Sequence, residues 1–487
     1  MLSCVQSATL SGAIGQAVSV EVLVSNGLPG FTIVGLPDAS VREARDRVRA
    51  AILSSGLSWP MKRVTVGLAP SGVRKGGAGL DLPIAVGLLV ATGDLPPDCT
   101  AGLGFCGELG LNGSLRHVPG MIALADASTA DGLVVPLCDV NEATLVRESG
   151  VHGAATLAQL VSILRRQSAW PVAEASTPAA AAPGPDLADV HGQRVGRRAL
   201  EVAAAGRHHL LLIGPPGSGK TMLAERLPGL LPPLTKEEAM TVSRIHSSAG
   251  VAMPASPLQE RPPFRAPHHQ ATIISLVGGG SASPRPGEAS LASHGVLFLD
   301  ELGEFPVAAL ESLRQPLEEG VIRVSRAAGT AEFPASFLLV AAMNPCPCGE
   351  GVYKGACSCS VVMRARYRRR ISAPFLDRFD LVVPVTRPTA SELLDRVPAE
   401  SSADVAARVA MARNRADSRG PQEPVLTKEA TDTLSRKLAE GELSARGLGK
   451  VTRVARTIAD LAEAEVVNDD HVSEALLLRA GRSVVVA

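Results

Sequence analysis

Residues 214–221 of the chain read Gly214-Pro215-Pro216-Gly217-Ser218-Gly219-Lys220-Thr221. It matches the phosphate-binding loop pattern G-x-x-x-x-G-K-[ST] at every fixed position. Residues 209–213 before it predict a buried strand, and residues 222–227 after it predict a helix. Glycines let backbone amides approach phosphate oxygens, and a helix N-terminus favours negative charge. We therefore expect Lys220 to reach the β- and γ-phosphates of a nucleotide and the Thr221 hydroxyl to hold Mg²⁺.

A second segment, residues 295–301, is an apolar run that ends in the two acids Asp300 and Glu301. A buried strand that delivers acids at its carboxyl end suits a nucleotide site at the edge of a parallel sheet. We expect Asp300 to bind Mg²⁺, directly or through water, and Glu301 to polarise the attacking water. Alone, the segment could also be a core strand with solvated acids at its tip. Together with the loop, it predicts a nucleoside triphosphatase.

Composition limits the class of protein. A length of 487 residues suggests about three domains, and an apolar content of 46% is ample for packed cores. The formal net charge is +0, so binding to nucleic acid would have to come from local basic patches. No Lys or Arg precedes Arg42, and no run reaches the roughly 18 apolar residues that a spanning helix needs. We expect a soluble, cytoplasmic protein with no membrane partner.

Residues 1–168 alternate short β-branched runs with glycine turns and helical stretches, which predicts an α+β or α/β domain. The clearest elements are strands at 19–24 and 63–68, a helix at 38–54 with Asp38 as its N-cap, and a more buried helix at 82–91. Residues 169–187 are rich in Ala and Pro and predict a linker.

The rest of the chain divides into residues 188–390, which carry the nucleotide motifs, and residues 391–487, whose pattern is almost wholly helical. Amphipathic helices are expected at 443–465 and 470–482, the second capped by Asp469 or Asp470. A phosphate-loop core followed by a small helical lid is the layout of an AAA+ ATPase module.

Several longer motifs accompany the loop. They are residues 264–269, 278–280, 286–288 and 341–349, with residues 27–31, 33–38 and 81–85 near the N-terminus. In this order they resemble the magnesium-chelatase-like AAA+ ATPases, and within them the ComM/YifB group of competence-associated DNA motors. The resemblance covers nearly the whole chain apart from the linker. It implies an α/β fold: an N-terminal ribosomal-S5/Lon-protease-like α+β domain, an AAA+ core with a parallel sheet, and a C-terminal helical lid.

The resemblance also implies catalytic roles. Asn344 stands at the sensor 1 position, where a polar side chain orients the lytic water. Arg378, within residues 375–380, looks like the arginine finger that reaches the neighbouring subunit's ATP. Arg446 looks like sensor 2 on the phosphates, with Arg453 as its rival on the same helix. Arg378 and Arg446 could each instead be a solvated charge, and residues 447–450 depart from the family pattern.

Two basic stretches are candidates for DNA contact. Residues 320–326, returning through 330–333, predict a β-hairpin that resembles the pre-sensor-1 hairpin of the family. We expect Arg323 and Arg326 to share one face of a strand and to contact DNA phosphates in the pore of a ring. The alternative is an exposed ribbon with solubilising arginines. Glycine- and proline-rich residues 265–290, in the long interval between the loop and the two acids, fit the family's helix-2 insert.

The second basic stretch, residues 364–370, holds five arginines around Tyr367. It could bind the DNA backbone with Tyr367 stacked on a base, make an intersubunit contact, or form a solvated helix face.

Four of the eight cysteines form two C-x-C pairs, Cys346 with Cys348 and Cys357 with Cys359. Four soft ligands so close together suggest a tetrahedral, structural Zn²⁺ site that pins the segment between the sensor and the finger. Reduced structural thiols are the alternative. The scattered cysteines, which we expect to be small buried hydrophobes, are Cys4, Cys99, Cys106 and Cys138.

Three functions remain open. The resemblance implies a hexameric AAA+ ATPase that uses ATP and Mg²⁺ to move on single-stranded or branched DNA, as a helicase promoting branch migration in recombination and natural transformation. A Lon-like peptidase would need a Ser–Lys pair, for which Ser71 with Lys75 is the substitute, while Arg116 stands where the lysine is expected. A magnesium-chelatase subunit is the third, although chelatase motor subunits lack this N-terminal domain and the cysteine cluster.

Overall fold

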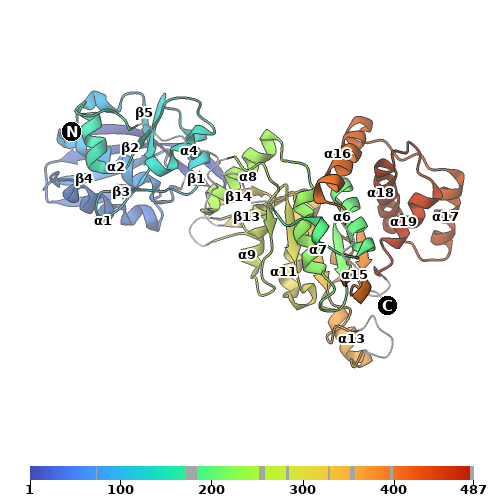
Figure 1. Cartoon of the computed structure of the whole chain (residues 1–487). Coiled ribbons are helices and arrows are strands. Elements are labelled where there is room, and N and C mark those ends of the chain that lie inside the picture. Colours follow the sequence, from blue (N-terminus) through green and yellow to red (C-terminus); the bar gives the residue numbers. More distant parts are fainter. Residues whose placement is uncertain are drawn as a thin grey trace.

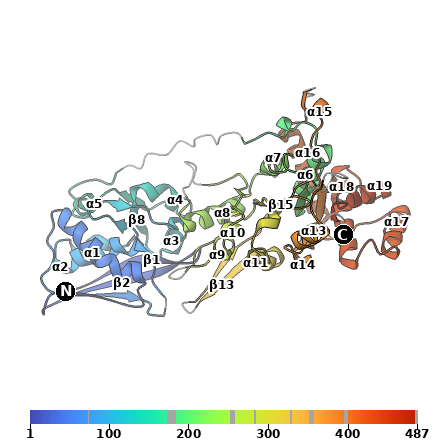
Figure 2. The ribbon, with the colours of Figure 1, turned by 90° about the horizontal axis from the view of Figure 1, so that it is seen from below.

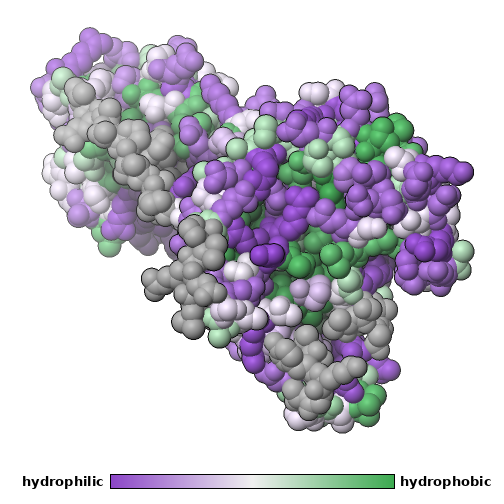
Figure 3. Space-filling view, turned by 45° about the vertical axis from the view of Figure 1, so that its right-hand side comes forward, coloured by the Kyte–Doolittle hydropathy of each residue, from purple (hydrophilic) through white to green (hydrophobic). Residues whose placement is uncertain are grey.

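The structure is a computed structural model that describes residues 1–72, 74–171, 184–251, 258–280, 284–326, 329–350, 357–394 and 399–482. Figure 1 shows an elongated molecule of three consecutive parts: an N-terminal α/β part, a central part around a second sheet, and a helical C-terminal part. Most of the linker expected at 169–187 lies outside the described residues. Figure 3 shows a largely hydrophilic face with apolar patches. Among the described helices, none has the length and apolarity to cross a membrane.

The N-terminal part is built on a seven-stranded mixed sheet in the order β3-β4-β2-β1-β5-β8-β9. Its strands are β1 (Leu2–Ser11), β2 (Ile14–Ser25), β3 (Gly30–Val34), β4 (Arg63–Ala69), β5 (Leu103–Phe105), β8 (Gly132–Pro136) and β9 (Val151–Ala154), with β6 (Glu108–Leu109) and β7 (Leu115–Arg116) as a separate pair. Its helices are α1 (Ala39–Ser54), α2 (Asp81–Thr92), α3 (Met121–Ala127), α4 (Val140–Thr144) and α5 (Leu157–Leu164). Alternate residues of β2, such as Val20 and Val22, are buried in one core with α1 and α2.

The strands and helices expected in this part are confirmed as β2, β4, α1 and α2. The Asp38 carboxylate caps α1 by accepting a hydrogen bond of 2.9 Å from the Val41 amide. The prediction for the scattered cysteines is wrong in part. Cys106 is buried, but Cys4 and Cys138 are exposed. Cys4 alternates with the buried Val5 along β1, which places it on the open face of the sheet.

The central part contains a five-stranded, all-parallel sheet in the order β11-β12-β15-β10-β16. The strands are β10 (Leu210–Ile213), β11 (Phe264–Arg265), β12 (Val296–Leu299), β15 (Leu338–Met343) and β16 (Leu381–Pro384). Every residue of β10, β12 and β15 is buried, as expected for a sheet covered on both faces. Because the strands are parallel, the loops that follow β10, β12 and β15 meet at the carboxyl edge of the sheet.

Helices and a hairpin surround this sheet. The helices are α6 (Arg194–Gly206), α7 (Lys220–Arg226), α8 (Lys236–Ala249), α9 (Ile273–Val277), α10 (Glu288–Leu291), α11 (Val307–Ser312), α12 (Arg314–Glu319), α13 (Val361–Arg368), α14 (Ala373–Leu376) and α15 (Ala390–Leu394). The expected hairpin is confirmed, with β13 (Val321–Arg326) antiparallel to β14 (Gly329–Pro334). Figure 2 shows it projecting from the central part on the side of the β1–β2 ribbon.

The C-terminal part consists of α16 (Ser402–Arg419), α17 (Lys428–Ala439), α18 (Ala445–Leu461) and α19 (Asp469–Leu477). Helices α16 and α18 pack on α6, so this part shares a core with the central sheet. The predicted cap of the last helix is wrong. Asn468 has the extended backbone that a cap needs, and its side chain accepts a 3.0 Å hydrogen bond from the His471 amide. Asp469 and Asp470 lie in the first turn instead.

The N-terminal part docks on α8 of the central part. Ser247 of α8 accepts a hydrogen bond of 2.8 Å from the Gly120 amide and donates one of 2.5 Å to the Glu142 carboxylate. Beside this contact, Arg244 pairs with Asp126 at 3.0 Å. The two parts are therefore joined by specific polar contacts as well as by the linker.

Candidate nucleotide site

The phosphate-binding loop lies between β10 and α7, at the carboxyl edge of the central sheet. Gly217 and Gly219 have φ angles of 75° and 81°, a conformation that strains residues with a Cβ. The Lys220 ammonium donates to the carbonyl oxygens of Gly214 at 2.8 Å and Pro215 at 3.0 Å. Burial lowers the pKa of Lys220, and the nearby charge of Asp300 opposes this shift. The ammonium group of Lys220 therefore places a positive charge at the centre of the loop.

Asn344, the predicted sensor, follows β15 at the same edge. Its Oδ1 atom lies 3.3 Å from the Lys220 ammonium and accepts a hydrogen bond from it. This contact joins residues 124 positions apart in the chain. The structure thus brings the loop and the sensor together.

The two oxygen ligands expected for Mg²⁺ also meet here. The Thr221 hydroxyl donates a hydrogen bond of 2.7 Å to one oxygen of Asp300. The other Asp300 oxygen accepts a 2.8 Å hydrogen bond from the Glu301 amide. A hydroxyl next to a carboxylate suits Mg²⁺, which prefers hard oxygen ligands and phosphate oxygens. The residues present therefore fit the ion.

His269 is a partner of Glu301 that was not predicted from the sequence. His269 Nδ1 lies 3.0 Å from Glu301 Oε2, and Glu301 has a left-handed backbone with φ of 51°. His269 follows β11, the edge strand that pairs with β12, and Glu301 follows β12. The motif at 264–269 was visible in the sequence, but its contact with Glu301 depends on the strand order.

Gln193 is a second residue of the site that was not predicted from the sequence. Its side-chain amide donates to the carbonyl oxygens of Ser218 at 2.9 Å and Thr386 at 2.6 Å, so it ties the phosphate loop to the segment after β16. Its chain neighbours Gly192 and Arg194 line a cavity of about 530 Å³. This volume is within the range of small-molecule pockets, and the cavity is a candidate for the nucleoside end of the ligand.

The three candidate arginines lie at the opposite edge of the sheet. The Arg378 guanidinium pairs with Glu318. Burial lowers the pKa of Arg378, and the nearby charges of Arg314 and Arg446 lower it further. Arg453 pairs with Asp380 at 3.5 Å.

The strand register shows that these arginines lie at the amino edge of the central sheet. The Asp380 amide bonds to the carbonyl of His209, the residue before β10, whereas the phosphate loop follows the other end of β10. The structure therefore does not bring Arg378, Arg446 or Arg453 to the phosphate loop of their own chain.

The strand β13 does not support the predicted arrangement of Arg323 and Arg326. Along β13, Ile322 and Val324 are buried and Arg323 is exposed. Residues three apart on a strand fall on opposite faces, so Arg323 and Arg326 do not share a face, and the prediction that they do is wrong. The Arg326 side chain lies outside the described residues. Arg323 pairs with Glu319 at 2.5 Å and Glu332 at 3.1 Å.

The basic stretch 364–370 is divided between two environments. Tyr367 is buried against Gly303, and burial raises its pKa to about 12, so the prediction that it could stack on a base is wrong. Arg370 donates to the Gly303 carbonyl at 2.9 Å and pairs with Glu304 at 2.7 Å. Tyr367 and Arg370 therefore both contact the turn that follows Glu301. Arg366 and Arg369 are exposed.

The four clustered cysteines converge on one point. The Sγ atom of Cys346 lies 3.3 Å from that of Cys348 and 3.6 Å from that of Cys357, and Cys348 lies 3.7 Å from Cys357. With Cys359 included, all four Sγ atoms lie within 4.8 Å of one another. Tetrahedral Zn²⁺ with bonds of about 2.3 Å separates its sulfurs by about 3.8 Å, so the donor set fits this ion.

The substitute Ser–Lys pair of a peptidase is not formed. Lys75 is fully buried, and its ammonium donates to the carbonyl of Pro70, whereas Ser71 is exposed. Arg116 lies on β7 opposite Glu108. The geometry therefore gives no support to serine–lysine proteolysis at this place.

A parallel five-stranded sheet with the phosphate loop on one strand and paired acids on a second defines a P-loop ATPase of the AAA+ type. Residues 186–393 match the family described as magnesium chelatase, subunit ChlI. Residues 20–138 match subunit ChlI of Mg-chelatase, and residues 399–479 match its C-terminal family.

Similar proteins are known in several bacteria. An uncharacterized protein of Mycobacterium tuberculosis is 44% identical over 97% of both chains. YifB of Escherichia coli is 42% identical, and the competence protein ComM of Haemophilus influenzae is 41% identical, each over 98% of this chain and 97% of the relative. The chain belongs to the ComM/YifB family of magnesium-chelatase-like ATPases.

Proposed function

We propose that the protein is a ring-forming, hexameric AAA+ ATPase that moves on DNA and promotes branch migration during recombination. The observation that carries the proposal is the separation of the catalytic groups. The loop, Asp300 and Asn344 lie at one edge of the sheet, and Arg378 and Arg446 lie at the other. A complete site then needs a second copy of the chain. The name of the relative ComM, a competence protein, supports DNA as the substrate.

In the proposed site, Lys220 binds the β- and γ-phosphates of ATP. Thr221 and Asp300 hold Mg²⁺, which neutralises charge on the phosphates. Glu301 accepts a proton from the attacking water, and Asn344 orients that water. The contacts of Lys220, Asn344, Thr221 and Asp300 at the carboxyl edge support these roles.

The neighbouring subunit contributes Arg378 as the finger that stabilises charge in the transition state. Arg446 acts from the same neighbour as sensor 2, because it lies on α18 one turn before Lys450, which pairs with Asp380 two residues after Arg378. Arg323, on the exposed face of the hairpin, exchanges its pairs with Glu319 and Glu332 for DNA phosphates.

We also assign a structural Zn²⁺ to Cys346, Cys348, Cys357 and Cys359, since their sulfurs are spaced as in a closed four-thiolate site. Elemental analysis should find about one Zn²⁺ per chain. Metal-free protein that is purified under reducing conditions and retains full activity would contradict this assignment.

The test of the proposed function is ATP hydrolysis with and without single-stranded and branched DNA, together with a branch-migration assay. DNA should stimulate hydrolysis, and branched DNA should be resolved in an ATP-dependent manner. A magnesium-chelatase subunit, the second function that the family description suggests, has no reason to respond to DNA. Hydrolysis that is indifferent to every DNA tested would reject the motor.

Action in trans has its own test. Lys220→Ala and Arg378→Ala should each be inactive alone, and a mixture of the two should recover part of the turnover. A mixed ring contains interfaces with an intact loop on one subunit and an intact finger on the next. No recovery at any mixing ratio would show that Arg378 does not complete a neighbour's site.

A further inference from the structure

The cysteine cluster is in direct contact with the phosphate-binding loop. We define the cysteine knuckle as residues 346–350 together with Cys357 and Cys359. Gly349 of the knuckle has φ of 84°, and a Cβ built on it would lie 2.5 Å from Cδ of Pro216. Only glycine fits at such an approach, so the knuckle packs against the loop backbone itself.

A second contact joins the same two segments through Arg387, which follows β16. Its guanidinium donates to the Pro216 carbonyl at 3.1 Å and pairs with Glu350 at 2.7 Å. One side chain therefore connects the phosphate loop to the knuckle. The Arg387–Glu350 ion pair is half-exposed and therefore weak by itself. Its geometry depends on whether the backbone that carries Glu350 is fixed.

The third connection is covalent. Cys346 is fully buried and lies two residues after Asn344, whose amide oxygen accepts from Lys220. A fixed Cys346 fixes the backbone that carries the sensor. The knuckle thus reaches the nucleotide site from three directions: the loop backbone, Arg387 and the sensor strand.

We propose that Zn²⁺ bound by the four cysteines makes the knuckle a latch on the phosphate-binding loop, so that nucleotide affinity depends on the metal. The proposal rests on the proposed function, because it takes the loop to bind ATP. A closed four-thiolate site is structural, and its loss frees the segment that it holds. A loop that must be ordered on binding has lower affinity than one that is already ordered.

The experiment uses the full chain and measures two quantities, bound zinc by elemental analysis and ADP affinity by calorimetry in the presence of Mg²⁺. Cys359→Ser should lose zinc and weaken ADP binding by roughly fivefold or more, the order expected for one lost hydrogen bond. Cys4→Ser, which changes an exposed cysteine outside the cluster, should alter neither quantity.

Two further variants separate the latch from the metal site. Gly349→Ala and Arg387→Ala keep all four thiolates, so both should retain zinc and still weaken ADP binding. Arg49→Ala, at an exposed arginine of α1, is the matched control for the loss of a surface charge. Because Cys359→Ser could unfold the segment, wild-type protein is also stripped with a chelator, desalted and titrated before and after zinc is returned.

Recovery of ADP affinity on return of zinc, together with weak binding by zinc-loaded Gly349→Ala and Arg387→Ala, supports the latch. Wild-type affinity in the stripped protein, or in both zinc-loaded variants, overturns it while leaving the ATPase intact. Absence of ADP binding by the untreated wild type overturns the latch and the proposed function together. The two failures are therefore distinguishable.

Discussion

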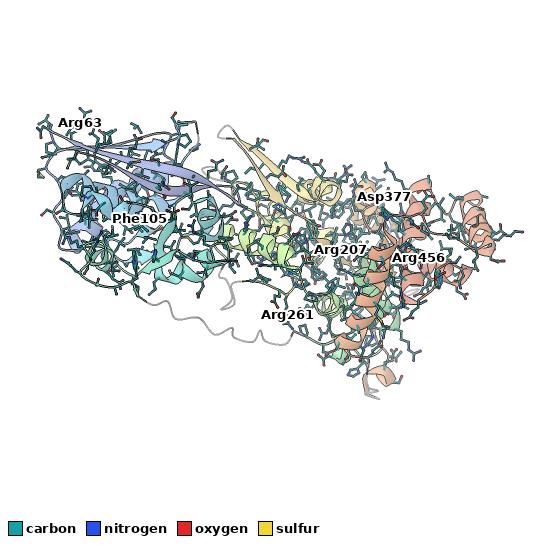
Figure 4. All side chains as sticks on the ribbon, turned by 90° about the horizontal axis from the view of Figure 1, so that it is seen from above. Arg63, Phe105, Arg207, Arg261, Asp377 and Arg456 are labelled. Carbon is teal, nitrogen blue, oxygen red and sulfur yellow. The ribbon has the colours of Figure 1, made fainter. Side chains whose placement is uncertain are left out.

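Asp380→Asn should loosen the C-terminal helices from the sheet. Asp380 is buried at the amino end of β16, where its carboxylate lies 3.1 Å from the Lys450 ammonium of α18. Burial alone would raise its pKa, but the hydrogen bond with His208 and the charge of Lys450 hold the pKa well below the usual range. Figure 4 labels Asp377 and Arg456 in this region, where the central part meets α18.

The magnitude follows from the burial of the partner. Lys450 has only 13% of its side chain exposed, so removing Asp380 leaves a buried charge without its counterion. Such a loss costs about 3–5 kcal/mol. At about 1.4 kcal/mol per factor of ten, the amides of α18 should exchange with solvent at least roughly a hundredfold faster, where exchange proceeds by local opening.

Hydrogen exchange followed by mass spectrometry measures this opening. The matched control is Asp377→Asn, whose partner Arg482 is 39% exposed and whose loss should cost at most about 1 kcal/mol. Adding Lys450→Met to Asp380→Asn should recover much of the protection, because the buried ammonium that lost its counterion is removed as well. Equal exchange in Asp380→Asn and in the control would refute the reasoning.

The same residue fixes the direction of the pH dependence. Because the pKa of Asp380 is lowered in the folded state, its contribution is fully present above the unfolded value of about 3.9. The contribution is lost as the pH falls through the lower folded value. The protection of α18 amides in the wild type, taken relative to intrinsic exchange at each pH, should therefore fall in acid, and Asp380→Asn should show less of that loss.

Three further variants test the nucleotide site and the hairpin. Glu301→Gln should still bind ADP but lose turnover by roughly 10²–10⁴-fold, and wild-type hydrolysis would remove Glu301 from the site. His269→Ala should lower kcat by roughly tenfold to a hundredfold with little change in ADP affinity, because His269 contacts Glu301, and an unchanged kcat would make the contact incidental. Arg323→Ala should weaken DNA binding and flatten its salt dependence by about one charge, with Arg326→Ala as the comparison for the opposite face.

Local patterns predicted the elements of the fold well. The loop between β10 and α7, the strand before Asp300, the hairpin and helix α18 all depend on neighbouring residues in the chain. The errors at the cap of α19 and at Arg323 and Arg326 were local ones. The error at Tyr367 has another cause, a partner from elsewhere in the chain. Tyr367 is part of an arginine-rich stretch, yet it is buried because Gly303, distant in sequence, leaves room for its ring.

The site shows the same division. The pairing of Thr221 with Asp300 was predictable, since both belong to motifs with a fixed place beside parallel strands. The contact of His269 with Glu301 was not predictable from the sequence, because it requires that β11 pair with β12 and not with another strand. Strand order follows from packing of the whole sheet, which no short stretch of sequence encodes.

The placement of Arg446 has a consequence for how the proposed ring would work. Strand β10 has four residues, about 13 Å at roughly 3.3 Å per residue, and it separates the phosphate loop from the edge where Arg446 and Arg378 lie. Arg446 lies one turn before Lys450, which is tied to Asp380, only two residues after Arg378. The Asp380–Lys450 ion pair therefore fixes the positions of both Arg378, the finger, and Arg446, the sensor 2 candidate. In the proposed ring, both arginines of one subunit contact the nucleotide of its neighbour, so a change of that nucleotide would alter the contacts of both arginines together. Breaking that ion pair by Asp380→Asn should then lower turnover without reducing ADP affinity.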